Sequence, residues 1–373
     1  MTGVQTCALP IYSLDISDKN LWHTPLLNFL KGKLAPTLVS LDISNNHISA
    51  ECAQYLSDFI ESSRTLKLLN ISSTLLTKSG ATILFSSIQN SSIEELYADN
   101  NILMKESCSA LGSSLKRNAN LHVLSVCGCD ILDESCIEIA KGIDESSELK
   151  QLRIESNSIY DSGAFEVANA IKRAKLELVS VADNQIWNNG TKAIIEAGFD
   201  NKYMKCLDLS YNVVDLELLS RLLLNNENIE AIGISGCKVN ENKFNEFIQN
   251  LSKTNLKTLI VNGLNFNELP VSWPKVDNEI WSKFFDSFII TLASFNTLKD
   301  LRIGYLNLDQ LYKLSSTLER LGNDNLVICF QDFGHTNDCW LYYSHDRHFE
   351  SPSNVFTWND EIPENSADRK SVV

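Results

Sequence analysis

The chain has 373 residues, of which 44% are hydrophobic, 21% charged and 9% aromatic, with 15 glycines and 7 prolines. This composition excludes a disordered, collagen-like or disulfide-dense protein and provides a buried core, in about two globular domains or one elongated repeat domain. The net charge of −15 argues against nucleic acid or an anionic membrane as partner, since both require a basic surface, and no run approaches the ~18 apolar residues of a membrane span.

Both ends of the chain are unlike its middle. Residues 1–11, MTGVQTCALPI, and residues 368–373, DRKSVV, resemble translated sequencing-adapter sequence. We therefore leave them out of the fold reasoning, as artefacts. An adapter at each end also predicts a reading frame that is cut on both sides, so we expect the chain to be a fragment.

One frame repeats through most of the remaining sequence. It reads Leu38-x-x-Leu41-x-Ile43-x-x-Asn46-x-Ile48, and positions 1, 4, 6 and 11 are apolar in all ten copies. A partial copy, with Ile11 at position 1, opens the chain, and a weak copy at Leu326 closes it. The other nine copies follow 25 to 28 residues apart, except the last, which follows after 42, and they start at Leu66, Ile93, Leu121, Leu149, Leu176, Met204, Ile229, Leu256 and Leu298.

Each copy predicts one strand and one helix. Alternation at positions 4 and 6 is typical of a short strand with one buried face, and helical spacing follows, as in Leu216, Leu219, Leu222 and Leu223. Neither element can bury its apolar side alone, so the copies must stack. Strands lie ~4.8 Å apart and helices ~10 Å apart, so we expect an α/β solenoid curved into a horseshoe, with parallel strands on the concave face and helices on the convex face.

This frame, with a full helix and a period near 28, resembles the ribonuclease-inhibitor-like class of leucine-rich repeats. The resemblance covers residues 11–330, and we place the native domain at 12–330. Position 9 carries an amide or thiol that can bond to exposed backbone groups in seven copies: Asn46, Asn101, Asn157, Asn184, Asn212, Cys129 and Cys237. Thr74, Leu264 and Leu306 depart from the pattern, which predicts a weaker ladder toward the C-terminus.

Three segments lie outside the regular frame. An insertion at about 267–283 contains two prolines and two tryptophans and predicts a surface loop that leads into a helix. Residues 331–350 are expected to form a C-terminal cap, because the histidines and cysteine there lack the paired spacing of a zinc site. Residues 351–367 are expected to form an exposed tail.

No catalytic motif, cofactor site or metal site emerges, so we expect a non-enzymatic protein. The thiols suit a reducing compartment, which favours a cytoplasmic location, and Cys127 is expected on the exposed side of the sheet. Ran GTPase-activating proteins share this repeat class and act through an arginine, but no local motif carries that role to Arg64, Arg117 or Arg153. The insertion is faintly similar to one in CARMIL-type actin regulators, and a surface adhesion repeat is a further alternative.

The outward strand positions form the predicted binding face. Tyrosine and arginine dominate interface energetics, and the acidic residues among them would attract a basic protein surface. The predicted protein-binding residues are Asp42, Tyr97, Asp99, Arg153, Glu155, Asp183, Asp208, Tyr211, Arg302 and Tyr305.

Overall fold

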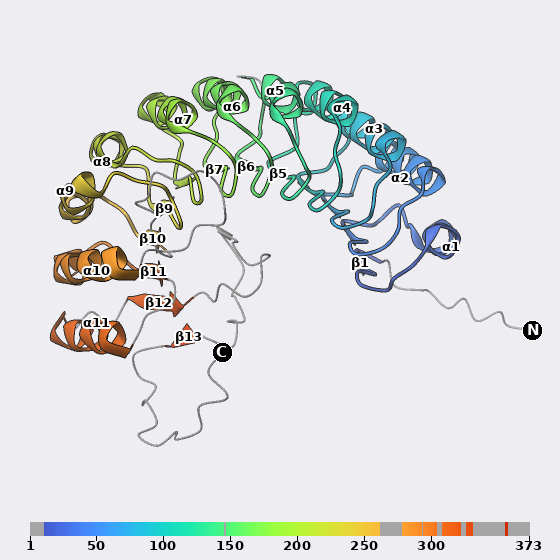
Figure 1. Cartoon of the computed structure of the whole chain (residues 1–373). Coiled ribbons are helices and arrows are strands. Elements are labelled where there is room, and N and C mark those ends of the chain that lie inside the picture. Colours follow the sequence, from blue (N-terminus) through green and yellow to red (C-terminus); the bar gives the residue numbers. More distant parts are fainter. Residues whose placement is uncertain are drawn as a thin grey trace, which may run out of the picture. The chain divides into compact units, whose positions relative to one another are not determined.

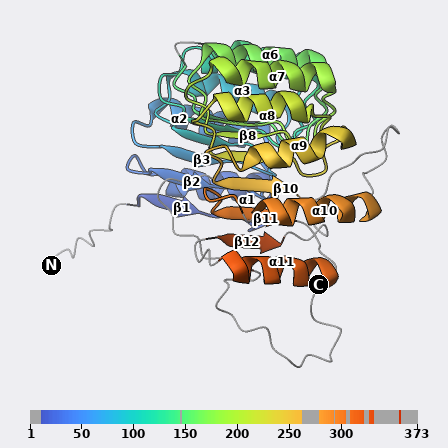
Figure 2. The ribbon, with the colours of Figure 1, turned by 90° about the vertical axis from the view of Figure 1, so that its left-hand side faces the viewer.

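The computed structural model describes residues 11–144, 147–261, 278–292, 294–303, 308–321, 326–330 and 355–356. It divides into two compact units, Met1–Met204 and Lys205–Val373, and each unit consists of strands that alternate with helices (Figures 1 and 2). Within the described ranges, no helix has the length and apolar character that a membrane crossing requires.

The described part of the first unit contains seven strands in one parallel sheet, each followed by a helix. Within it the helices lie on the outer side of a curved row and the strands on the inner side, as the predicted curvature requires (Figure 1). The strands are β1 Ser13–Asp15, β2 Ser40–Asp42, β3 Leu68–Asn70, β4 Glu95–Tyr97, β5 Val123–Ser125, β6 Gln151–Arg153 and β7 Leu178–Ser180. The helices are α1 His23–Lys33, α2 Ala50–Ser62, α3 Lys78–Ser87, η1 Ile88–Asn90, α4 Lys105–Leu115, α5 Asp133–Lys141, α6 Asp161–Arg173 and α7 Asn188–Asp200.

The second unit continues the same alternation. Strands β8 to β12 pair in parallel, and β13 pairs antiparallel with β12. The strands are β8 Cys206–Asp208, β9 Ala231–Gly233, β10 Thr258–Val261, β11 Asp300–Ile303, β12 Val327–Phe330 and β13 Val355–Phe356. The helices are α8 Leu216–Asn225, α9 Glu241–Leu251, α10 Asn278–Leu292 and α11 Leu308–Leu321.

The apolar positions of the repeat form the core, as predicted. In the copy of β2, Leu38, Leu41, Ile43 and Ile48 are almost completely buried, and the same holds for every described side chain at these positions in the ten copies. Each strand therefore buries two side chains against the helix layer and turns the residues between them to the other face. This alternation fixes which residues are available for binding.

The predicted ladder at position 9 is confirmed. Asn157 Oδ1 accepts hydrogen bonds from the backbone nitrogens of Cys129 (2.9 Å) and Ile131 (3.0 Å), and its Nδ2 donates to Val126 O (3.1 Å) in the preceding copy. Cys129 replaces an asparagine there and donates through Sγ to Ala98 O (3.3 Å). Whether it is an amide or a thiol, the side chain at position 9 forms hydrogen bonds with buried backbone groups just after the strand, which could not reach water.

Helices α4 and α5 touch through their backbones. A Cβ at Gly112 of α4 would overlap the carbonyl oxygen of Glu138, and a Cβ at Gly142, just after α5, would overlap the carbonyl oxygen of Gly112. Only glycine allows this close approach. At the surface, Lys78 and Lys105 bond to Glu106 (2.6 Å) and Glu134 (2.9 Å) of the next helix.

The predictions for the first copy and for the insertion can be compared with the structure. Ile11 is expected to fill the first apolar position, but the structure leaves it 39% exposed. The insertion helix is confirmed, since α10 buries Phe285, Phe288 and Leu292. The predicted cap at 331–350 lies outside the described residues, and so does the tail at 351–367 apart from β13.

Candidate protein-binding face

The last residues of strands β2 to β7 form one row in the first unit. Parallel pairing sets each of them directly beside its counterpart in the next strand. Because the strand backbones are hydrogen-bonded, these side chains are held on a rigid platform and lose little entropy when a partner binds. We call them the inner row: Asp42, Asn70, Tyr97, Ser125, Arg153 and Ser180.

Asp42 and Tyr97 are half-buried members of the inner row. Asp42 Oδ1 accepts from the backbone nitrogen (2.9 Å) and the hydroxyl (2.6 Å) of Ser44, and its Oδ2 accepts from Asn70 Nδ2 (2.8 Å). The Tyr97 hydroxyl donates to Glu95 Oε2 (2.9 Å), which holds the ring on the face of the sheet. Both side chains are oriented before a partner arrives.

Four predicted binding residues are buried: Asp99, Arg153, Glu155 and Asp208 expose only 4% to 5% of their surface. Asp99 shows the physical reason, because its carboxylate accepts hydrogen bonds from Ser125 Oγ (2.6 Å) and the backbone nitrogen of Cys127 (2.7 Å) on the neighbouring copy. Burial raises the pKa of the Asp99 carboxyl, although these hydrogen bonds and the nearby Arg153 lower it. These residues lie on the predicted face but are packed into it.

The expected exposure of Cys127 is wrong, since the side chain is buried between two acidic neighbours. Burial, Glu155 and Asp99 all raise the pKa of the Cys127 thiol. Burial also raises the pKa of Cys129, and it raises that of Cys108 to about 11. These thiols are therefore protonated and unreactive at neutral pH.

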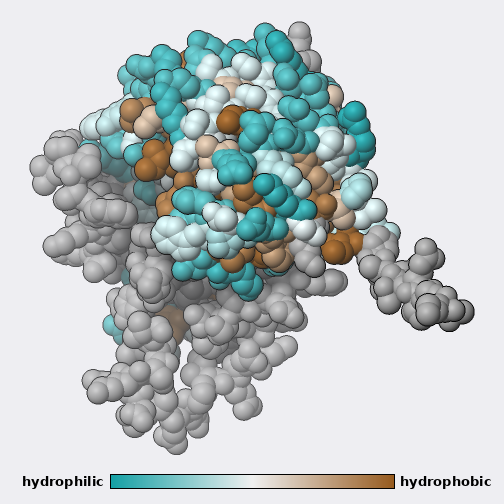
Figure 3. Space-filling view, turned by 90° about the vertical axis from the view of Figure 1, so that its right-hand side faces the viewer, coloured by the Kyte–Doolittle hydropathy of each residue, from teal (hydrophilic) through white to brown (hydrophobic). Residues whose placement is uncertain are grey.

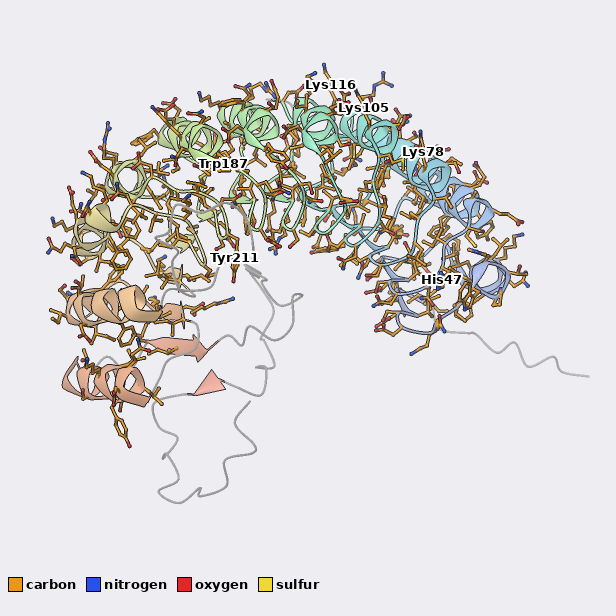
Figure 4. All side chains as sticks on the ribbon, in the orientation of Figure 1. His47, Lys78, Lys105, Lys116, Trp187 and Tyr211 are labelled. Atoms are coloured by element: carbon orange, nitrogen blue, oxygen red, sulfur yellow. The ribbon has the colours of Figure 1, made fainter. Side chains whose placement is uncertain are left out.

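In the second unit, Tyr211 is held in an unusual conformation. Its backbone has a φ of 59°, a left-handed value that is rare for a bulky residue. Gly236 of the next copy has a φ of 58°, and a Cβ there would overlap the Tyr211 ring. The glycine thus makes room for the half-buried tyrosine, whose position is labelled in Figure 4.

The remaining predicted residues have different environments. Asp183 is exposed in the first unit, at a φ of 52°. Arg302 is half-buried on β11 and forms an ion pair with Asp300 (3.0 Å). Tyr305 lies outside the described residues. The structure thus brings Asp42, Tyr97, Asp99, Arg153 and Glu155 onto one face of the first unit.

Sequence reasoning missed a polar pocket in the first unit. A cavity of about 790 Å³ is lined by Arg64 and Arg117, and Arg117 Nη1 donates to Gln89 Oε1 (3.2 Å). Arg64 follows the end of α2 and Arg117 follows the end of α4, two copies later. The repeat frame alone does not distinguish these positions from ordinary solvated ones. Over the described ranges, no three His, Cys, Asp or Glu side chains form a metal-binding group.

Strands, ladder residues and helices in regular succession define the class of protein as an α/β solenoid. A family model described as Leucine Rich repeat matches residues 35–57, which include β2 and the first part of α2. The fold is therefore that of a leucine-rich-repeat protein.

Comparisons with solved structures find similar chains. An internalin from Listeria monocytogenes is similar at 16% sequence identity, with 86% of this chain and 81% of that chain covered and a TM-score of 0.46. The comparison with curated protein sequences finds no significant match.

Proposed function

We propose that the chain is a non-enzymatic scaffold of the ribonuclease-inhibitor-like subclass that binds a partner protein on its inner row. Leucine-rich-repeat folds generally serve as protein interaction modules. The observation that carries the proposal is the row itself, in which Asp42 and Tyr97 are oriented by hydrogen bonds on a rigid sheet. Such preorganisation lowers the entropic cost of association.

The proposed partner presents a basic surface. Asp42, Glu95 and Asp183 are half-buried or exposed carboxylates on the first unit, and the whole chain has a net charge of −15. Opposite charge would speed encounter and make binding weaken with added salt. We further propose a cytoplasmic location, because none of the seven cysteines described in both backbone and side chain forms a disulfide.

A variant with Asp42→Asn, Tyr97→Ala and Glu95→Gln tests the proposal. These changes spare the buried carboxylates, so the fold is expected to survive. Immobilised wild type is expected to retain basic proteins from a cell extract at low salt, and the variant is expected to lose at least 30-fold in affinity for the principal one, as a tyrosine hot spot of ~2 kcal/mol predicts.

The matched control carries Glu51→Gln, Phe165→Ala and Glu196→Gln on the helices of the same unit. It makes the same kinds of change away from the inner row and is expected to bind as wild type does. Equal recovery by the inner-row variant and wild type, with both folded by circular dichroism, would exclude this face as the site.

The arginine pocket favours a second candidate function. Arg64 and Arg117 could contact the phosphates of a nucleotide held by a bound GTPase, as in a GTPase-activating protein. Hydrolysis of GTP by a panel of small GTPases, with wild type and with Arg117→Ala, tests it. Acceleration by wild type that Arg117→Ala abolishes would replace the scaffold proposal, and no acceleration by wild type would exclude this candidate.

A further inference from the structure

Six exposed apolar side chains line one edge of the first unit, where the chain passes from strand to helix. They come from five consecutive copies and are each 43% to 64% exposed. We call them the apolar rim: Leu75, Ile102, Met104, Leu132, Tyr160 and Trp187. Single exposed apolar residues are normal on a protein surface, but a row of them marks an interaction site.

The rim is continuous because its segments are hydrogen-bonded to one another. Ser158 N donates to Ile131 O (3.0 Å), Gln185 N donates to Ile159 O (2.9 Å), and Leu132 forms a parallel bridge with Ser158. Leu103 N donates to Cys129 O (3.0 Å) in the same way, so the backbone segments that carry neighbouring rim residues in these copies are about one strand spacing apart. Figure 3 shows hydrophobic patches between hydrophilic ones on the side of the molecule that it draws, and Figure 4 shows the position of Trp187.

Leu75 lies in a backbone conformation that disfavours leucine. Its φ is 52°, and it is among the most exposed of the six side chains. Asn20 and Asp130 occupy the same repeat position with φ values of 49° and 59°, and asparagine and aspartate tolerate this region. Neither burial nor backbone preference explains a leucine there.

Four rim residues occupy the N-cap of a helix without capping it. Met104, Leu132, Tyr160 and Trp187 precede α4, α5, α6 and α7, and none accepts a cap hydrogen bond through its side chain. Ser49 caps α2 and Thr77 caps α3 in the usual way.

For two of the uncapped helices, an aspartate of the preceding helix supplies part of the missing cap. Asp133 Oδ1 accepts from the backbone nitrogens of Tyr160 (2.8 Å) and Gly163 (2.9 Å), and Asp161 Oδ1 accepts from Trp187 N (2.8 Å). The cap position is thereby released to carry an aromatic ring.

The charges beside the rim select the partner. Lys78 and Lys105 are neutralised by Glu106 and Glu134, while the exposed Asp130 and Asp183 form no ion pair within the part of the chain that the structure describes. Of these four exposed side chains, only the two carboxylates carry a charge that no ion pair within the described residues offsets. A bound segment must combine apolar side chains with positive charge.

We propose that the apolar rim binds an amphipathic, basic α-helix of a partner protein. One helical turn rises about 5.4 Å, close to the strand spacing of about 4.8 Å, so apolar residues at i, i+3/i+4 and i+7 can meet successive copies. Five copies span about 20 Å, which corresponds to three to four helical turns. Lysine or arginine at the borders of that helix would lie near Asp130 and Asp183.

The test measures binding of a labelled 18-residue peptide of leucine and lysine, designed as an amphipathic helix, by fluorescence anisotropy. The rim variant carries Leu75→Asn, Leu132→Ser and Trp187→Asn, and the control variant carries Val39→Ser, Phe165→Ser and Tyr203→Ser, which are exposed apolar residues elsewhere on the same unit. We expect at least a tenfold loss of affinity in the rim variant and less than a twofold loss in the control. Asp130→Asn with Asp183→Asn is expected to weaken binding and to reduce its salt dependence.

A stability measurement separates a binding role from a structural role. The rim variant introduces residues that suit a left-handed backbone and N-caps, so its urea unfolding midpoint is expected to rise while binding falls. A lower midpoint would mean that the rim residues stabilise the fold and would overturn the proposal.

Four other outcomes would also overturn it. Two concern the peptide: equal binding by wild type and the rim variant, or equal binding of a scrambled peptide with no apolar face. A third is that wild type, but not the rim variant, floats with phosphatidylcholine vesicles, which would indicate a membrane surface. The fourth is that wild type is a dimer and the rim variant a monomer, which would indicate a second copy of the chain.

Discussion

Replacing the ladder residue Asn157 by alanine is expected to destabilise the first unit strongly. The change leaves the backbone nitrogens of Cys129 and Ile131 without an acceptor and the carbonyl oxygen of Val126 without its donor. Asn157 is buried, so water cannot replace the amide without opening the loop. At about 1–3 kcal/mol for each unsatisfied group, the two nitrogens alone predict a loss of about 2–6 kcal/mol, a large share of the stability of a typical domain.

Asn157→Cys is the matched comparison, because Cys129 occupies the same position in the preceding copy. A thiol can donate to the carbonyl oxygen as Cys129 does, so this variant is expected to lose less stability than Asn157→Ala. Alanine cannot accept a hydrogen bond and a thiol accepts only weakly, so both variants are expected to speed hydrogen exchange at Cys129 and Ile131. Urea unfolding and amide exchange provide the measurements. A loss below about 0.5 kcal/mol in Asn157→Ala, or unchanged exchange at both amides, would refute the reasoning.

Two further predictions concern Gly236 and Asp99. Gly236→Ala combines a left-handed backbone with overlap on the Tyr211 ring, so urea unfolding should show a loss of at least ~1 kcal/mol in the free energy of unfolding. The control Gly32→Ala lies in a helix with open space around it and should gain up to ~1 kcal/mol. Equal effects of the two substitutions would contradict this prediction. Because the pKa of the Asp99 carboxyl is raised, the folded state holds its proton more tightly than the unfolded state, and this contribution to stability is present below about pH 4 and lost as pH rises. Asp99→Asn should therefore raise the urea midpoint near pH 7 but not near pH 4, and equal midpoints at pH 7 would show the reasoning to be wrong.

The fold could be predicted from the sequence because the same apolar pattern recurs in every copy of the repeat. Leu41 and Ile43 alternate around Asp42, and the pattern recurs with the same outcome in strands β2 to β11. One copy alone would have been ambiguous, but stacking leaves a single way to bury all copies together. The asparagine ladder followed for the same reason, since each copy leaves the same backbone groups unsatisfied.

The binding face could be predicted only in part. Periodicity indicates which side of the sheet Arg153 or Asp208 occupies, but not how tightly neighbouring copies pack around it. That depends on lateral partners, such as Ser125 for Asp99, which lies 26 residues away in sequence. The apolar rim could not be predicted because its residues do not share one position of the repeat. Leu75 is at position 10 of its copy, whereas Leu132 is at position 12.

The close approach of Gly112 to Glu138 and Gly142 in the next copy limits how the copies of this array can be exchanged or duplicated. Copies in a solenoid contact only their neighbours, so unequal crossing-over can duplicate, delete or exchange most of them without loss of fit. The copies that carry Gly112 and Gly142 are an exception, because a new neighbour with a side chain at the facing position would drive a Cβ into a carbonyl oxygen. They are expected to be inherited as a two-copy module, and an engineered array should be lengthened on either side of that module rather than inside it.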